Sequence, residues 1–470
     1  MKRTVTLLLL SGSFIHAQAQ DFAGYRTGNY TGVNGVFFNP ANIADSRYKF
    51  DVNLVSLNVG VGNNQASFKL SELSKTFSSD SIQQQFFGKD KGATRGLINL
   101  DVHGPAVMFN TPGKFTFAIT SRVRVVGNVS DVDGKLIDKI SNDFAANDPD
   151  LPYTLKSQEN MRVNVSGWGE FGVAVGREVY NKGPHYIKAG ITLKYLAGVG
   201  NGNINIANFN GTLNADEVKM DAYLSNTTGT IGTTFSGINF SDFQADQLTR
   251  FTGRGFGTDL GAVYEFRPES QATSPYSAYK FKVGIALLDV GKIRFEKDMQ
   301  RSGTYDINIT GARRFYMANL DGVQLDNYNQ ELAKYPQDFT PAADNGKDNY
   351  SISLPTTLQL DGDYHIHHGF FVNMGVQLAL ASGKKKPFNS QYYSGVTVTP
   401  RYDSRIFGFY LPISYNGLTK MNAGASVRIG PLFFGSGSVF TALLGGSKQA
   451  DAFFGLRFGN LQKQKKAVAQ

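Results

Sequence analysis

The six histidines are the first candidates for chemistry, because a neutral imidazole can bind a metal ion or act as a general base. The stretch "HIHHG" places His365 and His367 on one face of an extended strand, a spacing that two zinc ligands can use. The same five residues also suit a polar turn, and we expect the turn and no metal ligands. The other histidines are His16, His103, His185 and His368.

Groups for covalent catalysis are sparse. No Gly-x-Ser-x-Gly stretch of the kind that carries a hydrolase nucleophile is present, and no serine can be assigned to His103 as a partner. The chain has no cysteine, which excludes disulfides, thiol chemistry and cysteine-based metal sites. Gly253, Gly255 and Gly257 precede a strand pattern instead of a helix, so they are not a dinucleotide-binding loop. We predict no enzyme activity, no catalytic residues and no cofactor.

Charged residues on the polar faces of alternating segments are more informative. Two interpretations of them are open: the charges pair with one another and fill a narrow lumen, or they form a selective surface for anionic or amphipathic solutes. Trp168 shares this face with its charged neighbours, so we expect it to face the lumen too. The expected lumen-facing charges are Arg122, Arg124, Arg162, Glu170, Lys188, Lys194, Lys280, Lys282, Asp361, Asp363 and Arg428.

Strict alternation over long segments predicts the strands that position these charges. From 162 to 175, apolar or glycine positions alternate with mostly polar positions without a break. Strands of soluble proteins have about 5–6 residues, whereas a tilted membrane strand needs about 9–11. The pattern predicts fourteen strands, near 50–61, 97–109, 115–127, 162–177, 186–198, 256–267, 280–290, 351–366, 370–381, 395–401, 405–415, 421–430, 432–442 and 451–458.

The connections between these strands alternate in length. Short turns are expected at 111–114, 181–184, 367–369 and 430–431, and long polar links at about 128–161, 199–255, 291–350 and 382–394. Short periplasmic turns and longer outer loops are typical of outer-membrane barrels, and an even strand number places both ends in the periplasm. We therefore predict an all-β fold, a transmembrane antiparallel barrel over residues 50–458, with a basic disordered tail at 459–470.

The N-terminus and the composition agree with this class. Lys2 and Arg3, an apolar run to Ile15 and the small-residue site Ala17-Gln18-Ala19 predict a signal peptide over residues 1–19. No later apolar run reaches 18 residues, so a closed barrel is the remaining way to cross a bilayer. The net charge of +9 comes without a basic stripe interleaved with aromatic residues, so we expect no nucleic acid partner.

The stretch "GVFFNPANIAD" resembles the N-terminal Asn-Pro-Ala segment of FadL-like barrels, a superfamily that also includes PorV-like and PorQ-like proteins. "GTDLGAVYEF", "GIALLDVGKIRF", "LPTTLQLDGDYHI", "VTVTPRYDS" and "RIGPLFFGSGSVF" resemble an uncharacterised family of Bacteroidetes outer-membrane barrels. The resemblance implies fourteen strands and an N-terminal plug, which we place at residues 20–49. Phe37 and Phe38 would anchor it against the lumen wall, and Asn39 and Pro40 would turn the chain toward the first strand. The expected plug residues are Phe37, Phe38, Asn39, Pro40 and Ala41. The same segment also fits an ordinary periplasmic leader with no gating role.

Two functions fit these expectations. The first is passive transport of small hydrophobic or amphipathic solutes across the outer membrane, after cleavage of the signal peptide. The alternative is an accessory or docking role in a secretion or surface-assembly complex of type IX character. The expected partners are outer-membrane lipid and the outer-membrane assembly machinery, joined under the alternative by components of that complex.

Overall fold

The computed structural model describes residues 21–67, 69, 92–111, 113–136, 151–239, 247, 249–271, 274, 276–342, 347–383 and 386–462. The expected signal peptide and most of the expected basic tail lie outside the described residues. Among the described residues, no helix is both long and apolar enough to cross a membrane.

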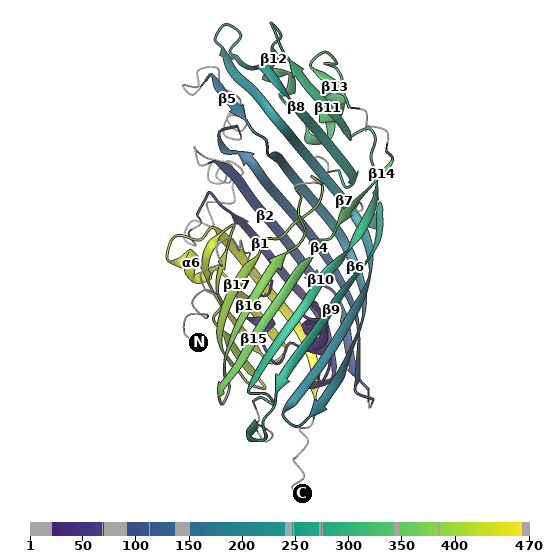
Figure 1. Ribbon diagram of the computed structural model, residues 1–470, viewed down its shortest axis with the longest axis vertical. Coiled ribbons are helices and arrows are strands. Elements are labelled where there is room, and N and C mark those ends of the chain that lie inside the picture. The colour runs from purple at the N-terminus through teal and green to yellow at the C-terminus, as the bar shows by residue number, and fades with distance from the viewer. Residues whose placement is uncertain are drawn as a thin grey trace, which may run out of the picture.

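Fourteen strand positions form one closed antiparallel barrel within the described residues, which confirms the predicted fold class and strand number (Figure 1). The last strand pairs with the first, because Val52 faces Phe458 and Gly60 faces Asp451. In chain order the barrel strands are β1 (Tyr48–Asn63), β2 with β3 (Ala93–His103, Ala106–Asn110), β4 (Phe115–Asp133), β6 (Asn160–Lys182), β7 (His185–Asp216), β9 (Gly253–Phe266), β10 (Phe281–Glu296), β14 with β15 (Asn349–Ser353, Thr357–His367), β16 (Phe370–Ala379), β17 (Gly395–Asp403), β18 with β19 (Phe407–Tyr410, Ile413–Asn416), β20 with β21 (Lys420–Ala423, Ala425–Ile429), β22 (Leu432–Ser436) and β23 (Gln449–Leu461).

Four strand positions are interrupted, and three of the breaks contain a proline. Pro105, Pro355 and Pro412 lie between β2 and β3, β14 and β15, and β18 and β19. Proline has no backbone N–H to donate to a neighbouring strand, so the ladder stops there. The last predicted strand before the closing one is also shorter than expected, since β22 ends at Ser436 and the short helix α6 (Val439–Leu443) follows.

One side of the barrel rises far beyond the other, where long polar links were predicted. β7 continues to Asp216, β8 returns beside it, and further strands extend the same sheet at the top of Figure 1. We call this part the strand extension. It consists of the end of β7 with β5 (Tyr153–Lys156), β8 (Asp221–Gly237), β11 (Gly303–Ile309), β12 (Phe315–Tyr316), η7 (Met317–Leu320), η8 (Leu325–Asn327), α5 (Tyr328–Leu332) and β13 (Phe339–Pro341).

The strand extension has an apolar cluster of its own. Phe209, Ile307, Ile309, Phe315 and Phe339 are buried members of this cluster, separate from the lumen. The prediction of loops at 199–255 and 291–350 was therefore wrong for these strands. Their sequences, such as "NGNINIANFNGTLNAD", are rich in Asn, Gly and Thr and carry too few apolar residues to resemble lipid-facing strands.

The two faces of the barrel wall differ as the period of two requires. Val173, Ile191 and Met374 point outward and are 55%, 40% and 56% exposed, whereas Trp168 and Lys194 point inward and are buried. Apolar side chains cover the outward face around the barrel, which is the surface expected of strands that face lipid. Outward aromatic residues lie beside the short turns: Phe109, Phe117, Tyr180, Tyr264, Phe281, Tyr364, Phe370 and Phe407. We call this end of the barrel the turn end and the opposite end the loop end.

Residues 21–47 lie inside the barrel near the turn end and form the plug, seen as purple coils in Figure 1. The plug consists of three short 3-10 helices, η1 (Tyr25–Thr27), η2 (Gly32–Phe37) and η3 (Pro40–Ile43). Asn39 is extended, and its side chain accepts a hydrogen bond from the Ala41 N–H at 2.9 Å. Pro40 then opens η3, because the first helical position needs no N–H donor. Asn39 and Pro40 thus begin a short helix, and the chain enters β1 after it, at Tyr48.

A row of glycines in the wall makes room for η3. Gly176 faces Gly190 across β6 and β7, and Gly190 faces Gly261 across β7 and β9. A Cβ atom at Gly190 would lie 2.6 Å from the Ala41 nitrogen and closer still to the Pro40 carbonyl. Because these neighbours are backbone atoms, they cannot rotate away, and the plug fits only against bare wall.

Replacing Gly190 by leucine should displace η3 while leaving the barrel closed. Overpacking of this kind costs about 1–3 kcal/mol, so the temperature at which the folded band disappears on heat-modifiable gels should fall. Protease should also cut the plug faster. Gly362→Leu is the matched control, because a Cβ there meets nothing within 4 Å. If the two variants behaved alike, the row of glycines would not be needed to make room for η3.

Candidate functional site

The lumen is closed from the loop end by a segment that was predicted to be an outer link. Residues 386–394, between β16 and β17, fold into the barrel, and we call them the inner loop. Asn128 Nδ2 donates to the Gln391 carbonyl and Asn164 Nδ2 to Ser390 Oγ, at 2.9 and 3.0 Å. Tyr392 reaches deepest, accepting from Arg124 at 2.7 Å and donating to Asn99 Oδ1 at 3.1 Å.

Seven buried ionic side chains form a central ion cluster between the plug and the inner loop. Arg124 Nη1 lies 2.8 Å from Asp289 and 3.1 Å from Glu170. Lys194 Nζ lies 2.7 Å from both Asp259 and Asp289. The cluster consists of Arg122, Arg124, Lys194, Asp101, Glu170, Asp259 and Asp289, none more than 8% exposed. Its cations are all paired, so the closed lumen matches the interpretation in which inward charges neutralise one another.

Three further ion pairs lie within the wall: Arg401 with Asp363, Arg428 with Asp403 and Arg457 with Asp51. Asp403 Oδ2 accepts the Asn29 N–H and Asp51 Oδ2 accepts the Val33 N–H, each at 2.6 Å. Each of these two carboxylates thus satisfies a wall arginine and a plug backbone group together.

Most of the residues proposed for the lumen lie there. Arg122, Arg124, Arg162, Trp168, Glu170, Lys188, Lys194, Asp363 and Arg428 are buried, and Lys282 and Asp361 are half-buried on the inward face. Trp168 Nε1 donates to Glu170 Oε1 at 2.8 Å, and Lys188 Nζ donates to the Ala44 carbonyl of the plug at 3.1 Å. Lys280 departs from the expectation: it precedes β10, so alternation does not orient it, and its ammonium lies over the Tyr364 ring at the turn end.

The plug residues proposed from the sequence contact the wall through rings and backbone. Phe37 stacks on the imidazole of His103 with ring centroids 3.9 Å apart, and Phe38 is buried with the Arg26 guanidinium 5.0 Å from its ring. Ala41 is fully buried beside Gly190.

The "HIHHG" stretch forms the turn between β15 and β16. His365 is hydrogen-bonded to Gln271 and to the His368 carbonyl, while His367 and His368 are exposed with their Nδ1 atoms 3.2 Å apart. Within the described residues, no three His, Cys, Asp or Glu side chains are grouped to hold a metal ion.

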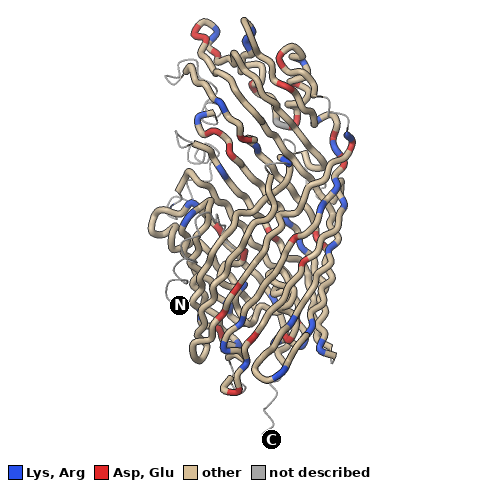
Figure 2. The backbone as a smooth tube through the Cα atoms, viewed as in Figure 1, with Lys and Arg blue, Asp and Glu red and all other residues tan. Residues whose placement is uncertain are grey.

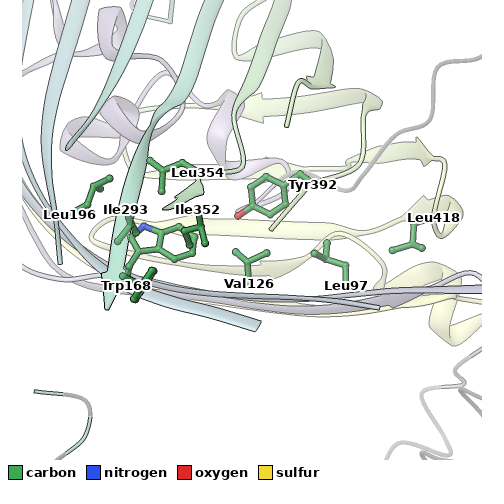
Figure 3. Packing of buried hydrophobic residues seen from close by; sticks show 10 residues of the cluster. Leu97, Val126, Trp168, Leu196, Ile293, Ile352, Leu354, Tyr392 and Leu418 are labelled. Atoms are coloured by element: carbon green, nitrogen blue, oxygen red, sulfur yellow. The ribbon is translucent and has the colours of Figure 1, made fainter. Parts of the chain in front are cut away.

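Buried apolar side chains pack around Tyr392 of the inner loop on the loop side of the ion cluster (Figure 3), and together with Tyr392 we call them the apolar ring. Val126 and Leu196 each stand two residues nearer the loop end than Arg124 and Lys194, which places the ring directly beyond the charges. Figure 3 shows the Tyr392 ring among these side chains. The ring consists of Leu97, Val126, Trp168, Leu196, Ile293, Phe295, Ile352, Leu354, Tyr392 and Leu418.

Little space remains where the plug, the cluster and Tyr392 meet. A cavity of about 30 Å³ there is lined by Arg26, Phe38, Arg124 and Gln359 among others. That is room for about one water molecule, whereas solute pockets usually have about 300–1,000 Å³. The lumen is therefore closed in this state by two inserts in series.

Sequence reasoning missed several of these site residues. Asp101 and Asp259 lie on strands that were predicted, at inward positions that the same alternation could have identified. Asp289 could not be found in this way, because it has the parity of the outward residues of β10 and a bulge between Leu287 and Val290 turns it inward. Asp403 and Arg457 could have been found by alternation, because they lie on β17 and β23. The mixture of acidic and basic positions along the barrel in Figure 2 comes in part from these pairs.

Comparison with protein families gives one match. Residues 40–437 match a family of unknown function, DUF5723. The chain belongs to this family. The match covers η3 of the plug and most of the DUF5723 barrel, including the inner loop. Comparison with curated proteins finds none that matches.

Solved barrels similar to this DUF5723 chain are distant from it. The Ralstonia pickettii toluene transporter TbuX has 9% identity and a TM-score of 0.39, over 92% of this chain and 95% of its own. A Pseudomonas aeruginosa FadL homologue has 10% identity and a TM-score of 0.44, and the match covers 94% of this chain and 98% of the homologue. The translocator domain of the Neisseria meningitidis autotransporter NalP has 7% identity and a TM-score of 0.31, and the match covers 87% of this chain and 88% of that domain. The similarity to FadL-like barrels expected from the sequence is thus found, and at these values it carries no argument about function.

Replacing Asp289 by asparagine should destabilise the closed barrel. Asp289 contacts both Arg124 and Lys194, and removing one partner of a buried ion pair costs about 3–5 kcal/mol. The measurement is the free energy of unfolding in detergent micelles. Asp361→Asn is the control, since that half-buried carboxylate has no cation within 4 Å among the described residues. If Asp361→Asn lowered the free energy of unfolding as much as Asp289→Asn, the ion pairs of the cluster would not be the cause of the loss.

Proposed function

We propose that this chain is an outer-membrane barrel that passes small hydrophobic or amphipathic solutes passively. The observation that carries the proposal is the order of surfaces in the lumen. An apolar ring lies beside a polar ion cluster, and the plug and the inner loop fill the lumen next to these two surfaces. An amphipathic solute has an apolar body and a polar head, and the two adjoining surfaces would accommodate both.

The two inserts are held with different strength, which suggests the order in which a path opens. Most inner-loop contacts are neutral hydrogen bonds, such as those of Gln391 and Ser390, each worth about 1 kcal/mol. The plug is bonded to carboxylates that are themselves ion-paired, and it fits a wall shaped for it. The inner loop is therefore the easier insert to displace, and the plug is the second barrier.

Planar-bilayer recording tests the transport proposal through this series arrangement. The intact barrel should show small conductance, and replacing 386–394 by a short Gly-Ser linker or deleting 21–47 should each raise it slightly. The double variant should conduct far more than the two single variants together, because neither insert then blocks the lumen. Entry of a small amphipathic dye into vesicles should follow the same order. Fractionation must also place the chain in the outer membrane, and a double variant no more conductive than the intact barrel would refute transport.

The strand extension favours a docking role as a second candidate. It stands beyond the barrel with its own apolar cluster, and the tip of its β7–β8 hairpin exposes Val218 and Met220, at 94% and 72%. A photoreactive residue at position 220, introduced in native outer membranes, should then give one discrete cross-linked protein. Position 173, which faces outward on the barrel wall, is the control. No product at position 220, or the same products at both positions, would remove the observation that favours docking.

A further inference from the structure

Arg162 differs from the other buried cations of the described wall. Its side chain is only 2% exposed, yet Nε and Nη1 have no hydrogen-bond partner, and no described carboxylate lies within 4 Å. Asp131 lies on the neighbouring strand but pairs with Arg95 at 2.6 Å. Asp131 and Glu159 are the described carboxylates whose charges act on Arg162, and neither pairs with it directly. Buried guanidinium N–H groups without an acceptor are unfavourable, so an oxyanion from outside the chain could satisfy them.

Two neighbouring hydroxyls lack partners in the same way. Ser130 lies directly across from Arg162 in the β4–β6 register, and its buried Oγ has no hydrogen-bond partner. Thr94 on β2 faces Val132, two residues along β4 from Ser130, and its Oγ1 is likewise buried and unsatisfied. Together the three side chains bring unmet donors to one inward patch on adjacent strands. Such donors suit an oxyanion, because guanidinium and hydroxyl groups donate to carboxylate or phosphate oxygens.

The inner loop and its leading residue cover this patch. Gly383 lies so close to Arg162 that a Cβ atom there would be 2.6 Å from Cζ of the guanidinium. The Gly383 N–H donates to Gln391 Oε1 at 3.0 Å, which ties this residue to the inner loop. Displacement of the inner loop would therefore also uncover Arg162.

We propose that Arg162, Ser130 and Thr94 form a binding site for an oxyanion, a carboxylate or a phosphate group, at the loop end of the lumen. Binding at this site requires that the inner loop moves aside, but it does not require that a solute passes the ion cluster and the plug. Binding and conduction are then separate measurements that can fail independently.

Isothermal titration calorimetry on the full barrel in detergent tests the site, with sodium phosphate and sodium octanoate as probes and sodium chloride at equal ionic strength as reference. At least one oxyanion should bind. Arg162→Gln should weaken its binding at least tenfold, Arg162→Lys less, and Ser130→Ala a few-fold. Octanoate alone binding would indicate an amphipathic carboxylate, and phosphate alone a phosphate group.

Arg254→Gln is the matched control, because Arg254 lies at the loop end of β9 but is exposed. It should bind the probe as the native chain does. The bound oxyanion should also raise the unfolding temperature of the native barrel and not that of Arg162→Gln, which a purely structural arginine would not produce. If Arg162→Gln does not fold, Ser130→Ala decides. No binding by the native chain, or equal loss in Arg254→Gln, would overturn the site.

Discussion

Most charges that face the inside of a narrow closed barrel have to find their counter-charges there, because the outward face must remain apolar. In this chain the wall solves the problem with Arg–Asp and Lys–Asp pairs, and both inserts are built on them. Asp51 and Asp403 hold the backbone of the plug while paired with arginines. Arg124 holds Tyr392 of the inner loop while paired with Asp289. The closed lumen thus follows from the neutralisation of inward charge.

The same constraint explains why the wall and its inserts are coupled. A buried ion pair contributes little net stability, but breaking it leaves a costly unpaired charge. The plug is hydrogen-bonded to carboxylates of such pairs. If the plug left, these carboxylates would lose its N–H donors, and water would have to enter the lumen to replace them. The inner loop contacts mostly amides and hydroxyls, which exchange readily for water. Opening from the loop end therefore disturbs fewer ions than opening from the turn end.

Alternation in the sequence was enough to predict the barrel, because each membrane strand must keep one apolar face. It placed the starts of β4, β6 and β16 within two residues, although β4 and β6 run five or six residues further than predicted, and it also put Arg124, Glu170 and Lys194 on the inward face. It could not predict the inner loop, whose Asn, Ser, Gln and Tyr residues suit an outer loop equally well. Its partners, Asn128 and Asn164, are more than two hundred residues away, so only barrel closure brings them together. The strand extension was missed because long parts of its strands are rich in Asn, Gly and Thr and carry few apolar residues.

The ion cluster has three cations and four carboxylates, and the near balance of charge limits what can give the lumen its selectivity. Paired ions present a polar surface with a small net field, so they would discriminate weakly between anions and cations of similar size. Shape and the apolar ring would then sort solutes by their hydrophobic part. Within the described wall, Arg162 is a buried cation without a direct ion pair, and a preference for anions would therefore originate at the loop end, before a solute reaches the cluster.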